Sequence, residues 1–299
     1  LVLMALLFTS GPIISQASHH VDLSPEVSHH YAHNKDVKIH YVKAGSGPLV
    51  VMVHGFPDYW YSWRHQMNGL KKDFTVVAMD QRGYNRSDQP DGVESYAMHN
   101  LVSDVIAVIR DTGATQATVV GHDWGGAVAW QVAFNAPEVV QNLVILNLPH
   151  PNGMARELAS NPEQQRNSAY AWRFIEGSAE DPDVMFGGPM NPQTLARWVQ
   201  DPAAKVLYEA AFARSSFNGM LNFYKANYPR AGQPSPVATS EPLPKLAMPV
   251  LIFHGLQDTA LHSDGLNNTW DWVDNNVTLV TTPKANHFVQ QDAADLVTR

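Results

Sequence analysis

Residues 121–126, Gly-His-Asp-Trp-Gly-Gly, have the residue types of a turn that could carry a nucleophile. In a G-x-S-x-G turn, a strand bends sharply into a helix and exposes the central side chain, and glycines two positions away on either side make room. Here Gly121 and Gly125 flank Asp123, and the apolar run 117–120 comes just before. The pattern predicts an exposed aspartate nucleophile, and a turn with an aspartate helix cap is the alternative interpretation.

An aspartate at this turn changes the chemistry that a serine would perform. A serine that attacked a saturated carbon would form an ether, which water does not readily remove. A carboxylate forms an ester, which a water molecule activated by a neighbouring base can hydrolyse. Asp123 therefore indicates either the ring opening of an epoxide or the displacement of a halide, followed by hydrolysis of a covalent intermediate.

Such a cycle needs a base and an acid that orients the base, and both are found in loops after apolar runs. Asp258 follows residues 249–253, and His287 follows residues 277–281. The chain order Asp123, Asp258, His287 is the nucleophile-acid-base order of the α/β-hydrolase fold. Asp264 is the runner-up acid, but a helix cap explains it well. Asn147, also at a strand end, lacks the charge of an acid.

A second turn could stabilise the negative oxygen that forms during hydrolysis of the ester. The sequence His54-Gly55-Phe56-Pro57 follows an apolar run that ends at Val53. Its backbone can supply the N–H of Phe56, paired with the N–H of Trp124, as an oxyanion hole. A tight turn without a catalytic role is the alternative.

The elements that must position these residues alternate between strand and helix up to residue 148. This alternation predicts an α/β fold with a mostly parallel central sheet and helices on both faces. From 149 to 243 the pattern is helical with Pro- and Gly-rich turns, which indicates an inserted cap over the carboxyl ends of the strands. The expected strands are 37–42 (an edge strand), 48–53, 74–79, 140–146, 249–253 and 277–281; the expected helices are 60–70, 101–110, 127–134, 193–199, 203–214 and 289–299.

The domain organisation that follows has four parts. Residues 1–17 resemble a signal peptide, possibly truncated, because an apolar run is followed by a small-x-small pattern. Residues 18–148 and 244–299 form the two parts of the core, with the C-terminus expected to be truncated, and 149–243 form the cap. If the leader is genuine, the protein is exported to the periplasm or secreted; otherwise it is cytoplasmic.

Composition excludes several classes of partner. The net charge is −8 and no basic cluster occurs, so we expect no nucleic-acid partner. No run besides the leader approaches the length of a membrane span, so we expect no stable membrane insertion. We expect no metal: the chain has no cysteine, and the histidines at 19, 20, 29, 30 and 33 indicate a solvated terminus. The oligomeric state, monomer or homodimer, stays open.

Long stretches of the chain resemble the epoxide hydrolases of the α/β-hydrolase fold. The matching segments are HGFPDYWYSWRHQ (54–66), DQRGYNRSD (80–88) and GHDWGG (121–126), and the similarity extends over the chain after about residue 37. The resemblance implies a hydrolase acting on ether bonds without a cofactor. It also implies that cap tyrosines protonate the epoxide oxygen, and Tyr170 and Tyr224 match those positions in local sequence and order.

The expected substrate is a small apolar epoxide, which is converted to a vicinal diol. The residues expected to form its pocket are His54, Phe56, Pro57, Trp124, Trp172 and Phe223. One alternative is a haloalkane or haloacid dehalogenase with the same Asp-His-Asp triad. Another, of a different class, is a secreted effector or binding protein built on a hydrolase fold.

Overall fold

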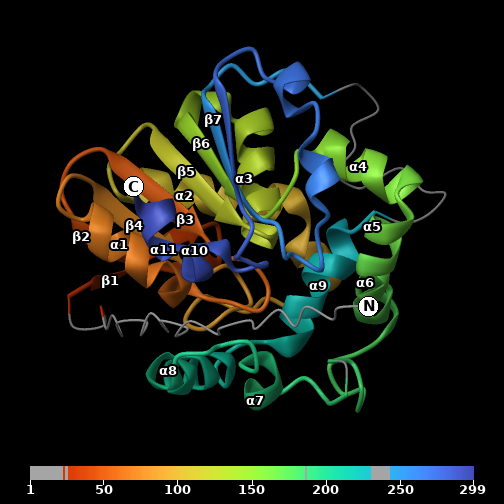
Figure 1. The fold of residues 1–299 in the computed structure, drawn as a ribbon. Helices are drawn as coiled ribbons and strands as arrows, with labels where there is room; N and C mark the ends of the chain where they lie inside the picture. Colours follow the sequence, from red (N-terminus) through yellow and green to blue (C-terminus); the bar gives the residue numbers. More distant parts are fainter. Residues whose placement is uncertain (1–22, 24–25, 186, 230–242) are drawn as a thin grey trace, which may run out of the picture.

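A computed structural model describes residues 23, 26–185, 187–229 and 243–299 of the chain (Figure 1). The predicted signal peptide lies outside these residues and stays a prediction. The predicted end of the cap, residues 230–242, also lies outside the described residues.

The described residues form one sheet of eight strands in the order β1-β2-β4-β3-β5-β6-β7-β8. The pairs β1/β2 and β2/β4 are antiparallel, and every pair from β4 to β8 is parallel. The strands are β1 (Ser28–Asn34), β2 (Val37–Gly45), β3 (Leu49–Val53), β4 (Thr75–Met79), β5 (Ala117–His122), β6 (Val140–Leu146), β7 (Val250–Gly255) and β8 (Val277–Thr282).

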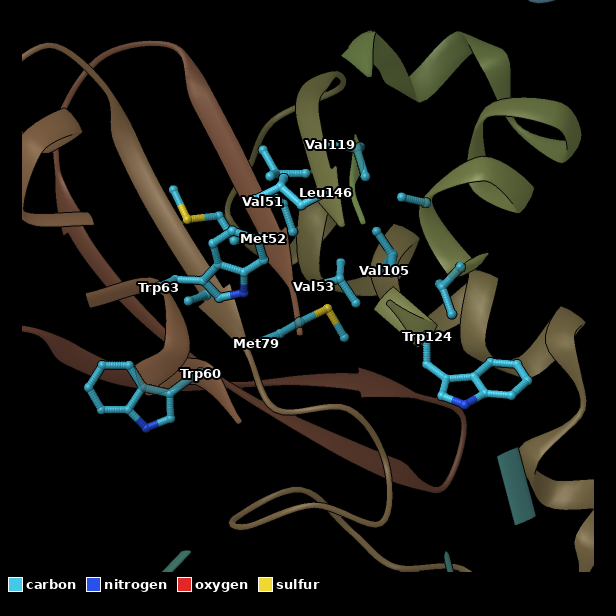
Figure 2. Close-up of a cluster of buried hydrophobic side chains, with 14 of the residues drawn as sticks. Val51, Met52, Val53, Trp60, Trp63, Met79, Val105, Val119, Trp124 and Leu146 are labelled. Carbon is cyan, nitrogen blue, oxygen red and sulfur yellow. The ribbon is translucent and has the colours of Figure 1, made fainter. Parts of the chain in front are cut away.

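The centre of this sheet is apolar on both faces, as a parallel sheet covered by helices requires. All five residues of β3 are buried, and Val51 pairs with Val77 on one side and with Val119 on the other. Figure 2 shows Trp63 to one side of the β3 side chains and Val105 to the other. The mostly parallel sheet is the one predicted from the sequence.

Core helices pack on the sheet in two groups: α2 packs against α3, and α1 packs against α11. They are α1 (Arg64–Leu70), α2 (Met98–Asp111), α3 (Trp124–Asn135), α10 (Val289–Asp292) and α11 (Ala294–Thr298). The described connections of the core also contain 3-10 helices, which are η1 (Trp60–Trp63), η2 (Val93–Tyr96), η3 (Pro137–Val139), η4 (Ser263–Leu266) and η5 (Thr269–Trp272).

Six helices are described between β6 and β7 in sequence, green to cyan in Figure 1. Asn161, Asp201 and Ser216 start three of them by accepting backbone N–H groups of the first turn. The helices are α4 (Pro151–Ser160), α5 (Pro162–Asn167), α6 (Ala169–Glu176), α7 (Pro192–Leu195), α8 (Pro202–Phe212) and α9 (Phe217–Asn227).

Four expectations about the elements were wrong. His29, His30 and His33 lie in β1, not in a solvated terminus, and β1 replaces β2 as the edge of the sheet. Sequence patterning missed β1 because its polar residues face solvent and a partner strand, not the core. Helix α7 ends at Leu195, and the last helix is divided at Ala293.

Neither metal binding nor membrane crossing has support in the described part of the chain. No described group of three or more histidine or acidic side chains could hold a metal ion. No described helix has the length and apolarity needed to span a bilayer.

Candidate active site

The turn between β5 and α3 holds Asp123 in a conformation that few residues adopt. Its φ is +52°, in the left-handed region, directly before the first residue of α3. Both flanking positions require glycine, because backbone atoms of other residues approach them closely. A Cβ on Gly121 would lie 2.2 Å from the carbonyl oxygen of Gly125, and one on Gly125 would lie 2.1 Å from that of Val53. The backbone is therefore strained where the carboxylate is presented.

The Asp123 carboxylate is held between a backbone donor and an imidazole. The Phe56 N–H donates to Oδ1 over 2.7 Å, and His287 Nε2 lies 3.5 Å from Oδ2. Burial alone would raise the pKa of Asp123, but the hydrogen bond and charge of His287 outweigh burial and lower it. Asp123 is thus a carboxylate at neutral pH, with 8% of its surface exposed.

The predicted acid, Asp258, contacts the imidazole of His287. His287 Nδ1 lies 2.9 Å from Asp258 Oδ2, and the N–H groups of Ala260 and Leu261 donate to Asp258 Oδ1. Burial opposes charge on both members of the pair. It is outweighed by their mutual attraction, which lowers the pKa of Asp258 and, together with Asp123, raises the pKa of His287 well above its usual range. Asp264, the runner-up, lies at the start of η4, exposed and beside His262.

Asn147 is a functional residue that sequence reasoning set aside. Its Nδ2 donates to Asp258 Oδ2 over 2.7 Å, and its Oδ1 accepts the N–H of Gly255. Its backbone φ of +42° turns the side chain at the end of β6 toward the acid. An amide cannot replace the acid, but its hydrogen bond can fix the position of the Asp258 carboxylate. The signal that the sequence offered was the position of Asn147 at the end of a predicted strand.

His122, directly before Asp123, contacts both the ring and the backbone of His287. Burial lowers the pKa of His122 to about 4, so its ring is neutral. Its Nε2 lies 2.8 Å from the backbone carbonyl of His287, and the two ring centroids are 4.9 Å apart. A neutral ring can donate to that carbonyl, which fixes the loop that carries His287.

Both backbone donors of the predicted oxyanion hole lie beside Asp123. The N–H of Phe56 already bonds to the carboxylate. The N–H of Trp124 is the first of α3, where backbone donors have no partner within the helix. The positive end of α3 adds to the stabilisation of negative charge at this point.

Tyr170 of α6 and Tyr224 of α9 line the same cavity as Asp123. Their ring centroids are 6.0 Å apart, and the Tyr224 ring lies 5.0 Å from the Trp124 ring. Burial is the main cause that raises the pKa of both tyrosines well above 10, and neighbouring charges, among them Asp123, add to it. Both hydroxyls therefore keep their protons at neutral pH.

The cavity above Asp123 has a volume of about 710 Å³. Trp124 and the exposed Trp172 line it, as predicted for the pocket, and α4 supplies one wall that the sequence did not indicate. Among the described residues that line it there is no lysine, arginine or histidine. The α4 wall consists of Pro151, Met154, Ala155, Leu158 and Ala159.

Four residues predicted for the pocket do not line this cavity. His54 is fully buried behind the turn: its Nε2 accepts the N–H of Gln81, and Nδ1 faces the Gly55 carbonyl. Burial lowers the pKa of His54 to about 4. Phe56 and Phe223 pack behind the lining, against aromatic rings that include Tyr224 and Trp124 respectively, and Pro57 is half-buried beside Phe56.

Comparison with known proteins agrees with this geometry. Residues 48–294 match the model of the alpha/beta hydrolase fold family. The chain therefore belongs to that family.

Individual relatives of the chain indicate which enzymes of this family it resembles. Epoxide hydrolase 1 of Caenorhabditis elegans is 31% identical over 280 residues, which are 89% of this chain and 67% of that protein. Mouse epoxide hydrolase 4 is 29% identical, over 90% of this chain and 77% of that protein. An epoxide hydrolase of Bacillus megaterium, solved with an inhibitor, superposes with a TM-score of 0.80 at 32% identity, covering 90% and 96% of the two chains. Within the family, this chain groups with the epoxide hydrolases.

Proposed function

We propose that this protein hydrolyses epoxides through a covalent ester on Asp123 and releases a vicinal diol. The observation that supports this most is the set of groups gathered around the Asp123 carboxylate and the cavity that it lines. They are a strained carboxylate, an acid-oriented imidazole, a backbone donor on the carboxylate and two protonated tyrosines. The relatives named epoxide hydrolase support the same activity.

Ring opening is the first step. Oδ2 of Asp123 attacks a ring carbon, forming a C–O bond while the C–O bond of the ring breaks. Oδ1, held by Phe56 N–H, becomes the carbonyl oxygen of the ester. Tyr170 and Tyr224 hold the epoxide oxygen, and one of them transfers a proton to it. An alkoxide needs such a donor, whereas a halide leaves as a stable anion, so the tyrosines favour an epoxide over a haloalkane.

Ester formation also prepares the second step. While Asp123 is charged, His287 faces two carboxylates and binds a proton tightly. Alkylation removes the charge of Asp123, so the pKa of His287 falls and the neutral imidazole becomes available as a base. His287 therefore becomes a base only after the ester has formed, so ring opening precedes hydrolysis.

In hydrolysis, water attacks the carbonyl carbon of the ester and its proton passes to His287 Nε2. The negative charge on Oδ1 is stabilised by the N–H groups of Phe56 and Trp124. The tetrahedral intermediate then collapses, the bond between the ester carbon and Oδ2 breaks, and the proton on His287 returns to the departing diol. The Asp123 carboxyl group is regenerated with one oxygen from water. Its proton passes through solvent to the tyrosine that protonated the epoxide, so both groups return to their starting states.

The cavity indicates the substrate class. Its volume exceeds what a small epoxide fills, its α4 wall is apolar, and Asp123 is the one described lining residue that carries charge at neutral pH. A neutral epoxide with a large lipophilic substituent fits these properties. Each added CH₂ should raise kcat/KM by up to about 4-fold, from a burial gain of about 0.8 kcal/mol. A terminal carboxylate of equal size should lower it.

The direct experiment measures diol formation from such an epoxide and the mass of the protein during turnover. His287→Gln should accumulate a protein adduct of the substrate's mass, and Asp123→Asn should form neither adduct nor diol. Asp264→Asn is the matched control for loss of an acid, and it should retain wild-type activity. Diol formation by Asp123→Asn at the wild-type rate would refute the proposal.

A further inference from the structure

The loop after β4 contains a buried acid whose hydrogen bonds lead toward the cap. Asp80 is fully buried, and its carboxylate accepts from His40 Nδ1 over 2.6 Å, from the Trp60 N–H over 3.1 Å and from Asn85 Nδ2 over 2.8 Å. Because a carboxylate only accepts hydrogen bonds, it fixes which end of the Asn85 amide faces the core. The amide oxygen of Asn85 must therefore point the other way.

That oxygen meets an arginine at the junction between α8 and α9. Arg214 Nε and Nη2 donate to Asn85 Oδ1 over 3.0 and 2.8 Å. Asn85 is 4% exposed and has a φ of +45°, a conformation that asparagine tolerates better than most residues. One amide thus links the buried acid of the core to a guanidinium of the cap.

Backbone contacts of the same junction reinforce this link. The Asn85 N–H donates to Ser215 Oγ over 2.8 Å, and the Ser216 N–H donates to the Gly83 carbonyl over 2.8 Å. Ser216 Oγ in turn accepts the N–H of Gly219 and starts α9. The beginning of α9 is thereby attached to the core loop, along the teal-to-cyan segment of Figure 1.

The other end of α9 has its own attachment, which lies just beyond Tyr224. Asn227 Nδ2 donates to the Tyr96 carbonyl over 2.9 Å, and the Phe223 ring lies 5.6 Å from the Tyr84 and Tyr96 rings. Two separated points define the axis of a helix. Without the Asn85–Arg214 contact, two hydrogen bonds would still hold the start of α9, those of Ser215 Oγ and Ser216 N–H. This weaker attachment would let α9 tilt, and the Tyr224 hydroxyl would move relative to the core.

We propose that Asn85 and Arg214 are positioning residues for the ring-opening step, because their contact fixes the α9 axis that aims Tyr224 at the epoxide oxygen. The inference rests on the proposed function. Neither residue lines the cavity or contacts Asp123, Asp258 or His287. Ester hydrolysis uses groups of the core alone, so it should not depend on this contact.

The size of the effect follows from the tolerance of catalytic geometry. Active groups must be held within about 0.5 Å of the productive position. Tyr224 lies three residues from Asn227, about 4.5 Å along the helix, so a tilt of about 5° moves its backbone by about 0.4 Å, and the hydroxyl further. We expect a roughly 10-fold slower ring opening, since a 1 Å error can cost about 100-fold.

The test uses Asn85→Gly, Arg214→Met and the double variant of the full chain, with single-turnover rapid quench and mass spectrometry. Glycine tolerates the positive φ and keeps the N–H to Ser215, so only the amide link is lost. Each single variant should slow ester formation roughly 10-fold and leave ester hydrolysis within about 2-fold, and the double variant should be no slower than either single one. Arg166→Met, which removes another exposed cap arginine, is the control and should leave both steps unchanged.

A second measurement distinguishes a misplaced proton donor from a general loss of structure. An epoxide with an electron-withdrawing substituent forms a more stable alkoxide, so it depends less on protonation, and the defect should shrink for that substrate. Equal slowing of both steps, additive losses in the double variant, or an undiminished defect with the activated epoxide would each overturn the inference. Absence of diol formation in the wild type would instead refute the proposed function.

Discussion

Replacing Asp123 by asparagine should lower the pKa of His287, because the amide removes charge as ester formation does. His287 Nε2 lies 3.5 Å from Asp123 Oδ2. At that separation and an effective dielectric constant of about 20, the attraction is about 4.7 kcal/mol, or about 3.5 pKa units. Since Asp258 still faces Nδ1 at 2.9 Å, the pKa should fall by this amount and no further.

The assay is an NMR titration of ¹⁵N-labelled histidine in the wild type, Asp123→Asn and Asp264→Asn, with mass spectrometry to verify that the new amide is intact. Asp264→Asn removes an exposed acid and should leave the His287 titration unchanged. The buried His122, with its pKa near 4, serves as a separate internal signal. An unchanged His287 pKa in Asp123→Asn would refute the idea that alkylation switches the imidazole into a base.

The other predictions concern pH, proton donors, acid orientation and the turn between β5 and α3. Because Asp123 has a lowered pKa and the two tyrosines have raised ones, the rate of ring opening should not change between pH 6 and about 8. The rate of ester hydrolysis should rise with pH as the imidazole loses its proton. Rapid-quench measurements of both rates over this range test the two expectations. Tyr224→Phe should slow ester formation about 10- to 100-fold and spare hydrolysis of a preformed ester. Asn147→Ala should slow ester hydrolysis roughly 10-fold, since one hydrogen bond to a charged acid is lost; equal slowing of ring opening would contradict that role. Gly125→Ala should yield little folded protein by circular dichroism, because its Cβ would meet the Val53 carbonyl.

Much of the core could be predicted from sequence because its signals are local. The apolar runs at β3 and β4 follow from burial on both faces. The strands β3, β4, β6 and β8 each lie within two residues of their expected positions. The order of Asp123, Asp258 and His287 placed them at the ends of strands that the sheet brings together. The structure places all three within contact distance.

The parts that escaped prediction depend on distant contacts. His40 and His29 are neighbours only because β1 and β2 pair, and no periodicity marks that pairing. His54 belongs to the right turn, yet its ring faces Gln81 on the far side of that turn from the cavity. The contact of Asn147 with the acid depends on the position of Asp258. The α4 wall faces the cavity only because the fold brings α4 to the same cavity as Asp123.

The central claim is that water attacks an ester carbonyl on Asp123, not the epoxide itself. Single-turnover reaction in H₂¹⁸O, with enzyme in excess, tests this most directly. One ¹⁸O should appear in the peptide that contains Asp123, and the first diol released should carry none, since its new oxygen comes from the carboxylate. Label in the first diol and none in the peptide would contradict the account.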